Sequence, residues 1–187
     1  NWRWFQRGCL RVERACHKGE VDALAGPWRL GRWRLKSRLL LAPMECVSDC
    51  AYRRMCFEQG AGFTFTEMVR PAAVARRNRS TFNRIDTFDP ATPTSVQFLG
   101  SGPKDIRSAL ETLDALSEGE CQHWAKGIHG VDINFGCPST NVIRDGLGPA
   151  LLNRAKVLCE VFDTLAEWRA RTRLPIGMIG AKIRLGL

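Results

Sequence analysis

The chain has 187 residues, of which 44% are hydrophobic and 25% are charged, a composition typical of one sizeable globular domain. No apolar run reaches the length of a membrane span, and the first forty residues lack the order of a signal peptide. The net charge of +9 suggests a polyanion partner, but residues 1–38, with ten basic and three acidic side chains, account for most of it. Any RNA-binding role must therefore be argued from local patches.

Residues 1–38 differ in composition from the rest of the chain. They hold four of the six tryptophans as well as most of the excess charge. We predict that this stretch is a basic, Trp- and Arg-rich extension with little fixed structure. The alternative is a basic, aromatic arm that contacts nucleic acid.

The eight cysteines do not form a recognisable metal or disulfide pattern. They occupy positions 9, 16, 46, 50, 56, 121, 137 and 159, with no CxxC and no paired Cys/His spacing. We expect reduced thiols in a cytosolic or organelle-interior protein without a metal. The loose group of Cys46, Cys50 and Cys56 leaves a metal or iron–sulfur site open as an alternative.

From Leu39 onward, short apolar runs alternate with helical patterns. The first helix has Ser48 or Asp49 as its N-cap and Gly60 beyond its end, and the third has Pro103 near its start. The predicted strands are residues 38–43, 62–69, 93–100, 130–136 and 175–186, and the predicted helices are residues 48–60, 71–77, 103–116 and 155–172.

This alternation predicts an α/β fold with parallel strands. Five β/α units match the rhythm of a (β/α)₈ barrel, which needs about 250 residues. Two architectures remain open on the pattern alone. One is a smaller open α/β sheet, which the pattern slightly favours because it needs no missing piece; the other is the front part of a TIM barrel.

Polar residues gather where the predicted strands end, which is where parallel α/β folds carry their function. A carboxamide, a lysine and a thiol at one edge suit a flat polar heterocycle that needs hydrogen bonds and a proton donor. Each residue taken alone also has an ordinary structural explanation; Gln97 could cap a loop, and Cys137 could be buried and inert. The set comprises Ala42, Pro43, Met44, Glu45, Thr66, Glu67, Arg70, Gln97, Asp132, Asn134, Cys137, Lys182 and Arg184.

Six sequence blocks resemble the tRNA-dihydrouridine synthases in order and spacing. They are LAPMECVSD, TEMVR, VQFLG, VDINFGCPS, GLGPALL and KIRLG, and together they extend over roughly residues 40–186. The resemblance implies a TIM barrel that binds FMN, followed in the family by a helical domain. It also implies NADPH as reductant and reduction of the uracil 5,6 double bond in tRNA, by a monomeric cytoplasmic enzyme.

The resemblance also implies roles for individual residues. Cys137 matches the catalytic acid of the family. The arginine in TEMVR looks most like the branch that modifies position 16 of the D-loop. The matched flavin-binding residues are Ala42, Pro43, Met44, Gln97 and Lys182, and the matched substrate or tRNA residues are Arg70, Asn134 and Arg184.

The chemistry of the residues agrees with these roles. A flavin can supply a hydride, so the protein must supply a proton donor at the uracil edge. A cysteine thiol of ordinary pKa, about 8.5, is mostly protonated at neutral pH and can serve. Gly136 allows a sharp turn before Cys137, and Pro138 restricts that cysteine to an extended conformation.

The sequence departs from the family pattern in two ways. Cys46 stands where the family usually has glycine, so the loop after the flavin-contacting turn is expected to sit differently. Residues 39–187 do not include the segments that in the family supply strands six to eight, a histidine, the FMN phosphate site and the helical domain, so we expect these residues alone to be inactive. Two alternatives stay open: another FMN barrel that reduces a free pyrimidine or enone, and a flavin-free RNA-binding module.

Overall fold

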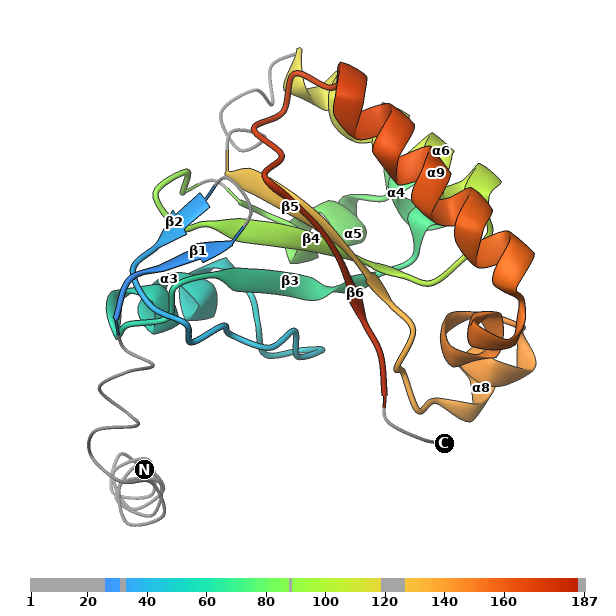
Figure 1. Ribbon diagram of the computed structural model, residues 1–187, viewed down its shortest axis with the longest axis horizontal. Coiled ribbons are helices and arrows are strands. Elements are labelled where there is room, and N and C mark those ends of the chain that lie inside the picture. The colour runs from blue at the N-terminus through green and yellow to red at the C-terminus, as the bar shows by residue number, and fades with distance from the viewer. Residues whose placement is uncertain (1–25, 31–32, 88, 119–126, 185–187) are drawn as a thin grey trace.

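A computed structural model describes residues 26–30, 33–87, 89–118 and 127–184 (Figure 1). Its centre is a four-stranded parallel sheet in the order β3-β4-β5-β6. The strands are β3 (Thr64–Val69), β4 (Thr94–Leu99), β5 (Ile128–Asn134) and β6 (Met178–Lys182). The predicted strands 62–69, 93–100, 130–136 and 175–186 are therefore confirmed, each with ends shifted or shortened by a few residues.

The order of the strands decides between the two architectures. Neighbouring strands in the sheet are consecutive in the chain. Because crossovers between parallel strands are almost always right-handed, this order is expected to place the connecting helices on the same face. A doubly wound sheet would instead reverse its strand order and carry helices on both faces. Figure 1 shows α4, α6 and α9 together on one side of the sheet. The chain is an α/β domain that forms part of a TIM barrel.

The apolar core lies between the sheet and these helices. Val96 and Phe98 of β4 and Ile133 of β5 point to that side and are fully buried against Leu110 and Leu165. Because side chains alternate along a strand, Gln97, Asp132 and Asn134 face the opposite, inner side. Apolar packing against the helices therefore fixes which residues reach the barrel interior.

The predicted first strand, residues 38–43, is present only as a single parallel bridge between Leu40 and Phe63. The backbone N–H of Leu41 donates to the carbonyl of Phe63 at 2.9 Å, and that of Gly62 donates to Leu39 at 2.7 Å. This segment thus lies beside β3, where a first barrel strand belongs, but it is shorter than predicted. Leu40 is 42% exposed, since no strand among the described residues pairs with its other edge.

The predicted helices are confirmed. They are α3 (Cys50–Glu58), α4 (Pro71–Ala75), α6 (Pro103–Ser117) and α9 (Ala155–Arg171). The N-cap of α3 is Asp49, whose carboxylate accepts from the backbone N–H of Tyr52 at 2.8 Å. The structure also contains three short elements: α5 (Arg79–Arg84), α8 (Thr140–Arg144) and the 3₁₀ helix η1 (Gly148–Asn153).

The expectation that residues 1–38 have little fixed structure is wrong for part of that stretch. The strands β1 (Trp28–Leu30) and β2 (Trp33–Leu35) pair as an antiparallel hairpin. The indole of Trp33 packs edge-on against His129 of β5, with 4.8 Å between ring centroids. A Cβ atom at Gly177 would overlap this indole, so the hairpin depends on a glycine there. Residues 1–25 and the possible basic arm lie outside the described residues.

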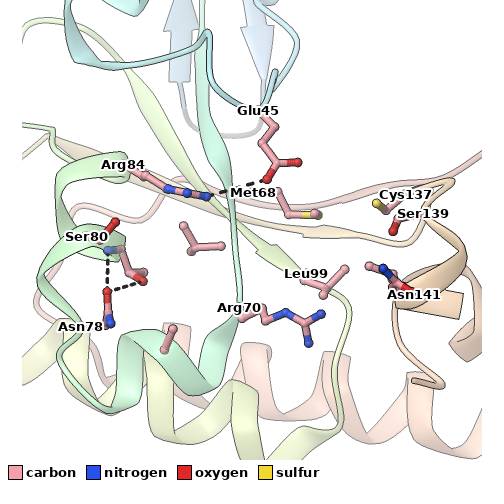
Figure 2. Close-up of a pocket in the computed structure, with 14 residues that line it drawn as sticks. Glu45, Met68, Arg70, Asn78, Ser80, Arg84, Leu99, Cys137, Ser139 and Asn141 are labelled. Atoms are coloured by element: carbon pink, nitrogen blue, oxygen red, sulfur yellow. Dashed lines mark hydrogen bonds and ion pairs between the residues drawn. The ribbon is translucent and has the colours of Figure 1, made fainter. Parts of the chain in front are cut away.

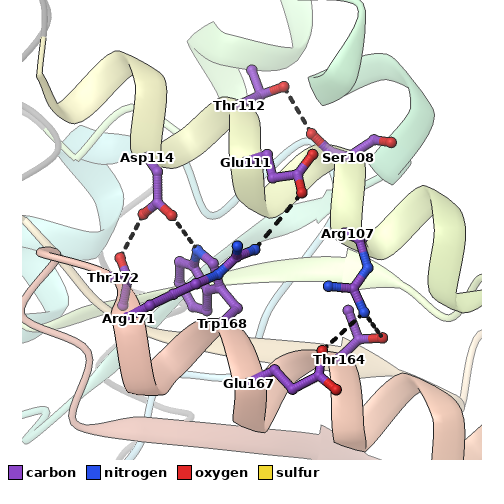
Figure 3. Close-up of polar contacts among 10 residues, drawn as sticks. All are labelled: Arg107, Ser108, Glu111, Thr112, Asp114, Thr164, Glu167, Trp168, Arg171 and Thr172. Atoms are coloured by element: carbon purple, nitrogen blue, oxygen red, sulfur yellow. Dashed lines mark hydrogen bonds and ion pairs between the residues drawn. The ribbon is translucent and has the colours of Figure 1, made fainter.

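The helices α6 and α9 are joined through Asp114 (Figure 3). Trp168, 1% exposed, donates its Nε1–H to Asp114 Oδ2 at 2.7 Å, and the Thr172 hydroxyl donates to the other carboxylate oxygen. On the surface, Arg107 of α6 pairs with Glu167 of α9 at 3.0 Å. The partly buried Trp168–Asp114 hydrogen bond is therefore expected to contribute more to the packing of the two helices than this surface ion pair.

Two general properties of the described residues bear on function. None of their helices is long and apolar enough to cross a membrane. Nor do three of their His, Cys, Asp or Glu side chains gather where they could hold a metal ion. Cys46, Cys50 and Cys56 are free thiols, as are Cys137 and Cys159.

Candidate active site

A chain of buried polar side chains runs across the inner face of β4 and β5. Asn134 Nδ2 donates to Gln97 Oε1 at 2.9 Å, and Gln97 Nε2 donates to Asp132 Oδ2 at 2.6 Å. The backbone N–H of Gly136 completes the chain by donating to Asn134 Oδ1 at 2.9 Å. Gln97, Asp132 and Asn134 are all less than a tenth exposed. Buried polar groups joined in this way hold a fixed arrangement.

Asp132 occupies a setting that disfavours its charged form. Burial raises the pKa of its carboxyl group to about 6, while the hydrogen bond from Gln97 and the charge of Lys182 act in the opposite direction. A Cβ atom at Gly180, on the neighbouring strand, would lie only 2.6 Å from Asp132 Oδ1. The absence of a side chain at Gly180 is therefore what makes room for this carboxyl group.

The Gly-Cys-Pro turn lies directly after β5. The N–H of Phe135 donates to the carbonyl of Lys182 at 2.8 Å, which continues the pairing with β6 up to the turn. Gly136 is buried and anchored by Asn134, whereas Cys137 is half-buried and Pro138 is exposed. The thiol therefore emerges at the mouth of the barrel from a turn that is anchored on its β5 side.

Cys137 lines a cavity of about 540 Å³ at the carboxyl ends of the strands (Figure 2). In this view Cys137 and Ser139 lie on one side of the cavity and Arg84 on the other, with Arg70 below. The lining residues are Glu45, Met68, Val69, Arg70, Ala73, Asn78, Ser80, Thr81, Arg84, Leu99, Cys137, Ser139, Asn141 and Val142. The cavity therefore joins a thiol to two guanidinium groups and several hydroxyl and amide groups.

Both arginines of the cavity make long, exposed ion pairs. Arg70 lies 3.6 Å from Asp145, and Arg84 lies 3.8 Å from Glu45. All four side chains are between 42% and 63% exposed, so the pairs add little to stability. A ligand with a stronger negative charge could replace the carboxylates at small expense.

The turn after the first strand position is ordered by local hydrogen bonds. The Ser48 hydroxyl accepts from the N–H of Met44 at 3.0 Å and donates to its carbonyl at 2.9 Å. Cys46 has φ 60°, a left-handed conformation that favours glycine, and its N–H donates to the buried carboxylate of Glu67 at 2.9 Å. The loop thus keeps a glycine-like backbone shape at the position where this chain carries cysteine.

The structure divides the residues expected from the sequence into three places. Cys137 and Arg70 line the cavity, while Gln97 and Asn134 lie in the buried chain on the inner face. Lys182 and Arg184 are exposed on and just beyond β6. The turn places Ala42 in an exposed position and Pro43 and Met44 in half-buried ones, and its Glu45 is the member that lines the cavity.

Residues 40–186 of the chain match the family model of dihydrouridine synthase (Dus). The chain belongs to the dihydrouridine synthase family. Curated relatives agree. A "Probable tRNA-dihydrouridine synthase" of Treponema pallidum is 30% identical over 169 residues, which are 89% of this chain and 46% of that protein. The tRNA-dihydrouridine synthase B of Escherichia coli K12 is 33% identical over 140 residues, 74% of this chain and 40% of that protein.

The chain thus spans less than half the length of these relatives. Among solved structures, it resembles an Old Yellow Enzyme from Pichia sp. AKU4542 with a TM-score of 0.47 and 14% identity, over 86% of this chain and 59% of that one. A variant of NCR from Zymomonas mobilis gives a TM-score of 0.48 and 16% identity, over 88% and 60%.

Two residues of this dihydrouridine synthase family site were not singled out from the sequence. The sequence marks Asp132 only as one of several polar residues at strand ends, although the period of two along β5 places it on the same face as Asn134. No motif marks Arg84. It lies at the end of α5, a short polar helix that carries no apolar periodicity by which it could be recognised.

Proposed function

We propose that this chain provides the flavin and uridine sites of an enzyme that uses FMN and NADPH to reduce the 5,6 double bond of uridine in tRNA. The observation that carries the proposal is the position of Cys137, which lines a cavity at the carboxyl ends of the strands and follows β5, the strand that carries Asn134 of the Gln97–Asn134 amide pair. Membership of the dihydrouridine synthase family supports it. The D-loop, and position 16 in particular, follow from the resemblance of TEMVR alone.

The residues on the inner face suit the edge of a flavin ring. In the hydrogen bonds that they make among the described residues, Gln97 and Asn134 each use one N–H and one oxygen lone pair, which leaves one of each for a ligand. Lys182 adds a positive charge on the adjoining strand. We assign ring binding to these three side chains, together with the backbone of Ala42, Pro43 and Met44. A bound flavin would supply the hydride.

Cys137 would donate the proton that completes reduction of the uracil ring. A general acid must come within hydrogen-bond reach of the atom that it protonates. Cys137 sits at the turn after β5 and faces the cavity rather than the apolar core. Its thiol is free, and the resemblance of the VDINFGCPS block to the family supports proton donation as its role.

The two arginines suit the phosphate groups of an RNA. A uridine must leave its base stack before it can lie on a flavin, which costs a few kcal/mol. Contacts to the neighbouring backbone can offset that cost. Arg70 and Arg84 lie in the same cavity as Cys137 and are held only by weak surface pairs. Arg184, exposed beyond β6, could contact the same RNA.

Substitution of Cys137 by alanine tests the catalytic role. In the protein expressed from its complete coding sequence, Cys137→Ala should retain flavin absorption and tRNA binding but lose dihydrouridine formation by at least about a hundredfold, the lower range for a general acid. Cys159→Ala, at an exposed cysteine of α9, is the matched control and should keep full activity. Unchanged dihydrouridine in tRNA treated with Cys137→Ala would reject the assignment.

The same preparation separates the alternative functions. Reduction of free uracil or an enone, with no action on tRNA, would indicate a small-molecule reductase. RNA binding without any flavin uptake at saturating FMN would indicate a binding module. Mapping the reduced uridine in tRNA tests the position within the D-loop.

A further inference from the structure

The hydrogen-bond chain on the inner face has a direction that is fixed at both ends. At one end the backbone N–H of Gly136 can only donate, and at the other a carboxylate can only accept. The Asn134 and Gln97 amides between them therefore have one orientation each. Turning either amide over would set two N–H groups or two oxygens against each other in a buried place, at about 1–3 kcal/mol.

Asp132 is the member of the chain that lies deepest along β5. It precedes Asn134 by two residues, so it sits about 7 Å further from the carboxyl end of the strand. Its Oδ2 accepts from Gln97, and its Oδ1 faces Gly180 of β6. The side chain is 4% exposed and, like Gln97 and Asn134, does not line the cavity that holds Cys137. Because its oxygens are directed to Gln97 and toward Gly180, we assign it a role through Gln97 rather than a direct contact with the uridine.

The charged carboxyl group of Asp132 also destabilises the folded protein at neutral pH. Burial raises its pKa, and the charged group that acts on it, Lys182 of β6, only partly compensates; Gln97 of β4 is neutral. A leucine of similar size would avoid this penalty. The carboxyl group thus contributes something that apolar packing would not, and the one strong contact that it makes is with Gln97.

We propose that Asp132 is a positioning residue for the flavin site. By accepting from Gln97 it fixes the Gln97 amide and, through it, Asn134. The free N–H and oxygen that each amide keeps then face the flavin ring in one defined pattern. Without the acceptor, Gln97 could turn over, and the pattern offered to the ring would change. This inference rests on the proposed function, because it concerns the same flavin site.

The test compares FMN affinity among variants of the protein expressed from its complete coding sequence. Fluorescence titration at pH 7.5 gives the dissociation constant for FMN, and circular dichroism confirms folding. Asp132→Leu, which has no acceptor, should bind FMN at least tenfold more weakly than the wild type. Asp132→Asn keeps an acceptor oxygen in the same shape and should recover most of the affinity. Asp163→Asn, exposed on α9, should bind like the wild type.

A double variant keeps the test decisive if Asp132→Leu does not fold. Gln97→Glu with Asp132→Asn reverses the donor and acceptor of one hydrogen bond while preserving shape. It should melt close to the wild type but still bind FMN at least tenfold more weakly, because residue 97 no longer has an N–H for the ring. Recovery of affinity together with stability would show that the chain is only structural and would overturn the inference.

The other possible results also distinguish the role of Asp132 from the proposed function. Asp132→Leu with wild-type FMN affinity would overturn the inference, as would Asp132→Asn binding as weakly as Asp132→Leu, since charge rather than orientation would then matter. If the wild type itself takes up no FMN, the proposed function fails. If the wild type binds FMN and the variants do not differ, only the role of Asp132 fails.

Discussion

The strands β4 and β5 have two faces that are buried alike but built differently. Phe98 and Ile133 on the helix side are 0% exposed, while Gln97, Asp132 and Asn134 on the inner side are 0%, 4% and 8% exposed. The helix side is satisfied by shape alone, whereas the inner side needs a specific partner for each polar atom. The degree of burial therefore does not distinguish the helix side, which stabilises the fold, from the inner side, which carries the candidate site. The hydrogen bonds among the inner side chains do. Variants of the two faces should accordingly fail in different ways.

The largest effect is expected on the helix side. Trp168→Ala removes a side chain that is 1% exposed and breaks its bond to Asp114, so the free energy of unfolding should fall by about 3–5 kcal/mol. Urea unfolding measures this loss. Phe162→Ala, at a side chain of the same helix that is 38% exposed, should cost much less. Equal losses for the two variants would contradict the assignment of Trp168 to the core.

On the inner face, the buried carboxyl group of Asp132 should make stability depend on pH. Its pKa is raised from 3.8 to about 6, so the folded state is favoured most when the carboxyl is protonated, below about pH 4. This contribution is lost as the pH rises through about 6. Relative to Asp132→Asn, the flavin-free wild type should therefore lose about 3 kcal/mol between pH 4 and pH 8, at about 1.4 kcal/mol per pKa unit.

Urea unfolding of both proteins over that pH range measures the difference, and Asp163→Asn corrects for the loss of an exposed carboxylate. A difference between wild type and Asp132→Asn that stays constant with pH would contradict the raised pKa of this buried carboxyl group.

Substitutions at the mouth of the barrel should affect RNA binding and leave the fold intact. Arg84→Ala should lower tRNA affinity several-fold, by about 1 kcal/mol, and reduce the slope of log affinity against log salt by about one unit. FMN affinity should not change. Arg171→Ala is the matched control, because Arg171 forms a similar exposed pair with Glu111 at 3.7 Å on the outer helices. If both variants bind tRNA equally well, the cavity is not the RNA contact.

The smallest effect is expected in the turn beside the cavity. Cys46→Gly should relieve a left-handed backbone conformation that disfavours side chains by about 1–2 kcal/mol. Greater freedom of glycine in the unfolded chain offsets part of this gain, so the net stabilisation should be about 0.5–1 kcal/mol. Thermal unfolding measures it. A destabilised Cys46→Gly variant would imply that the thiol makes a favourable contact of its own.

Much of the fold could be predicted because its local signals agree with its tertiary structure. The strands that became β3 to β6 are apolar runs bounded by turns, and α6 and α9 have clear helical periodicity. The hairpin of β1 and β2 was missed because residues 28–35 are rich in tryptophan and arginine and have no local strand pattern. It is held by the contacts of Trp33 with His129 and Gly177, which come from distant parts of the chain.

The site shows the same limit. Cys137, Gln97 and Asn134 could be proposed because strand ends and motif blocks mark them. The sequence did not suggest the bond between Gln97 and Asp132, because their contact joins neighbouring strands and depends on the space at Gly180. Arg84 reaches the cavity only through the path of α5. Pairings across the sheet and the paths of short polar helices are set by tertiary packing, which periodicity does not encode.

The contact between Trp33 and Gly177 has a consequence for folding. It joins residues near opposite ends of the chain, so it raises the contact order and should form late. During synthesis at about 5–20 residues per second, the hairpin would wait roughly seven to thirty seconds for Gly177 to emerge. Over that interval the Trp33 indole cannot pack against the backbone of Gly177. The nascent chain then exposes an aromatic surface that a chaperone could bind.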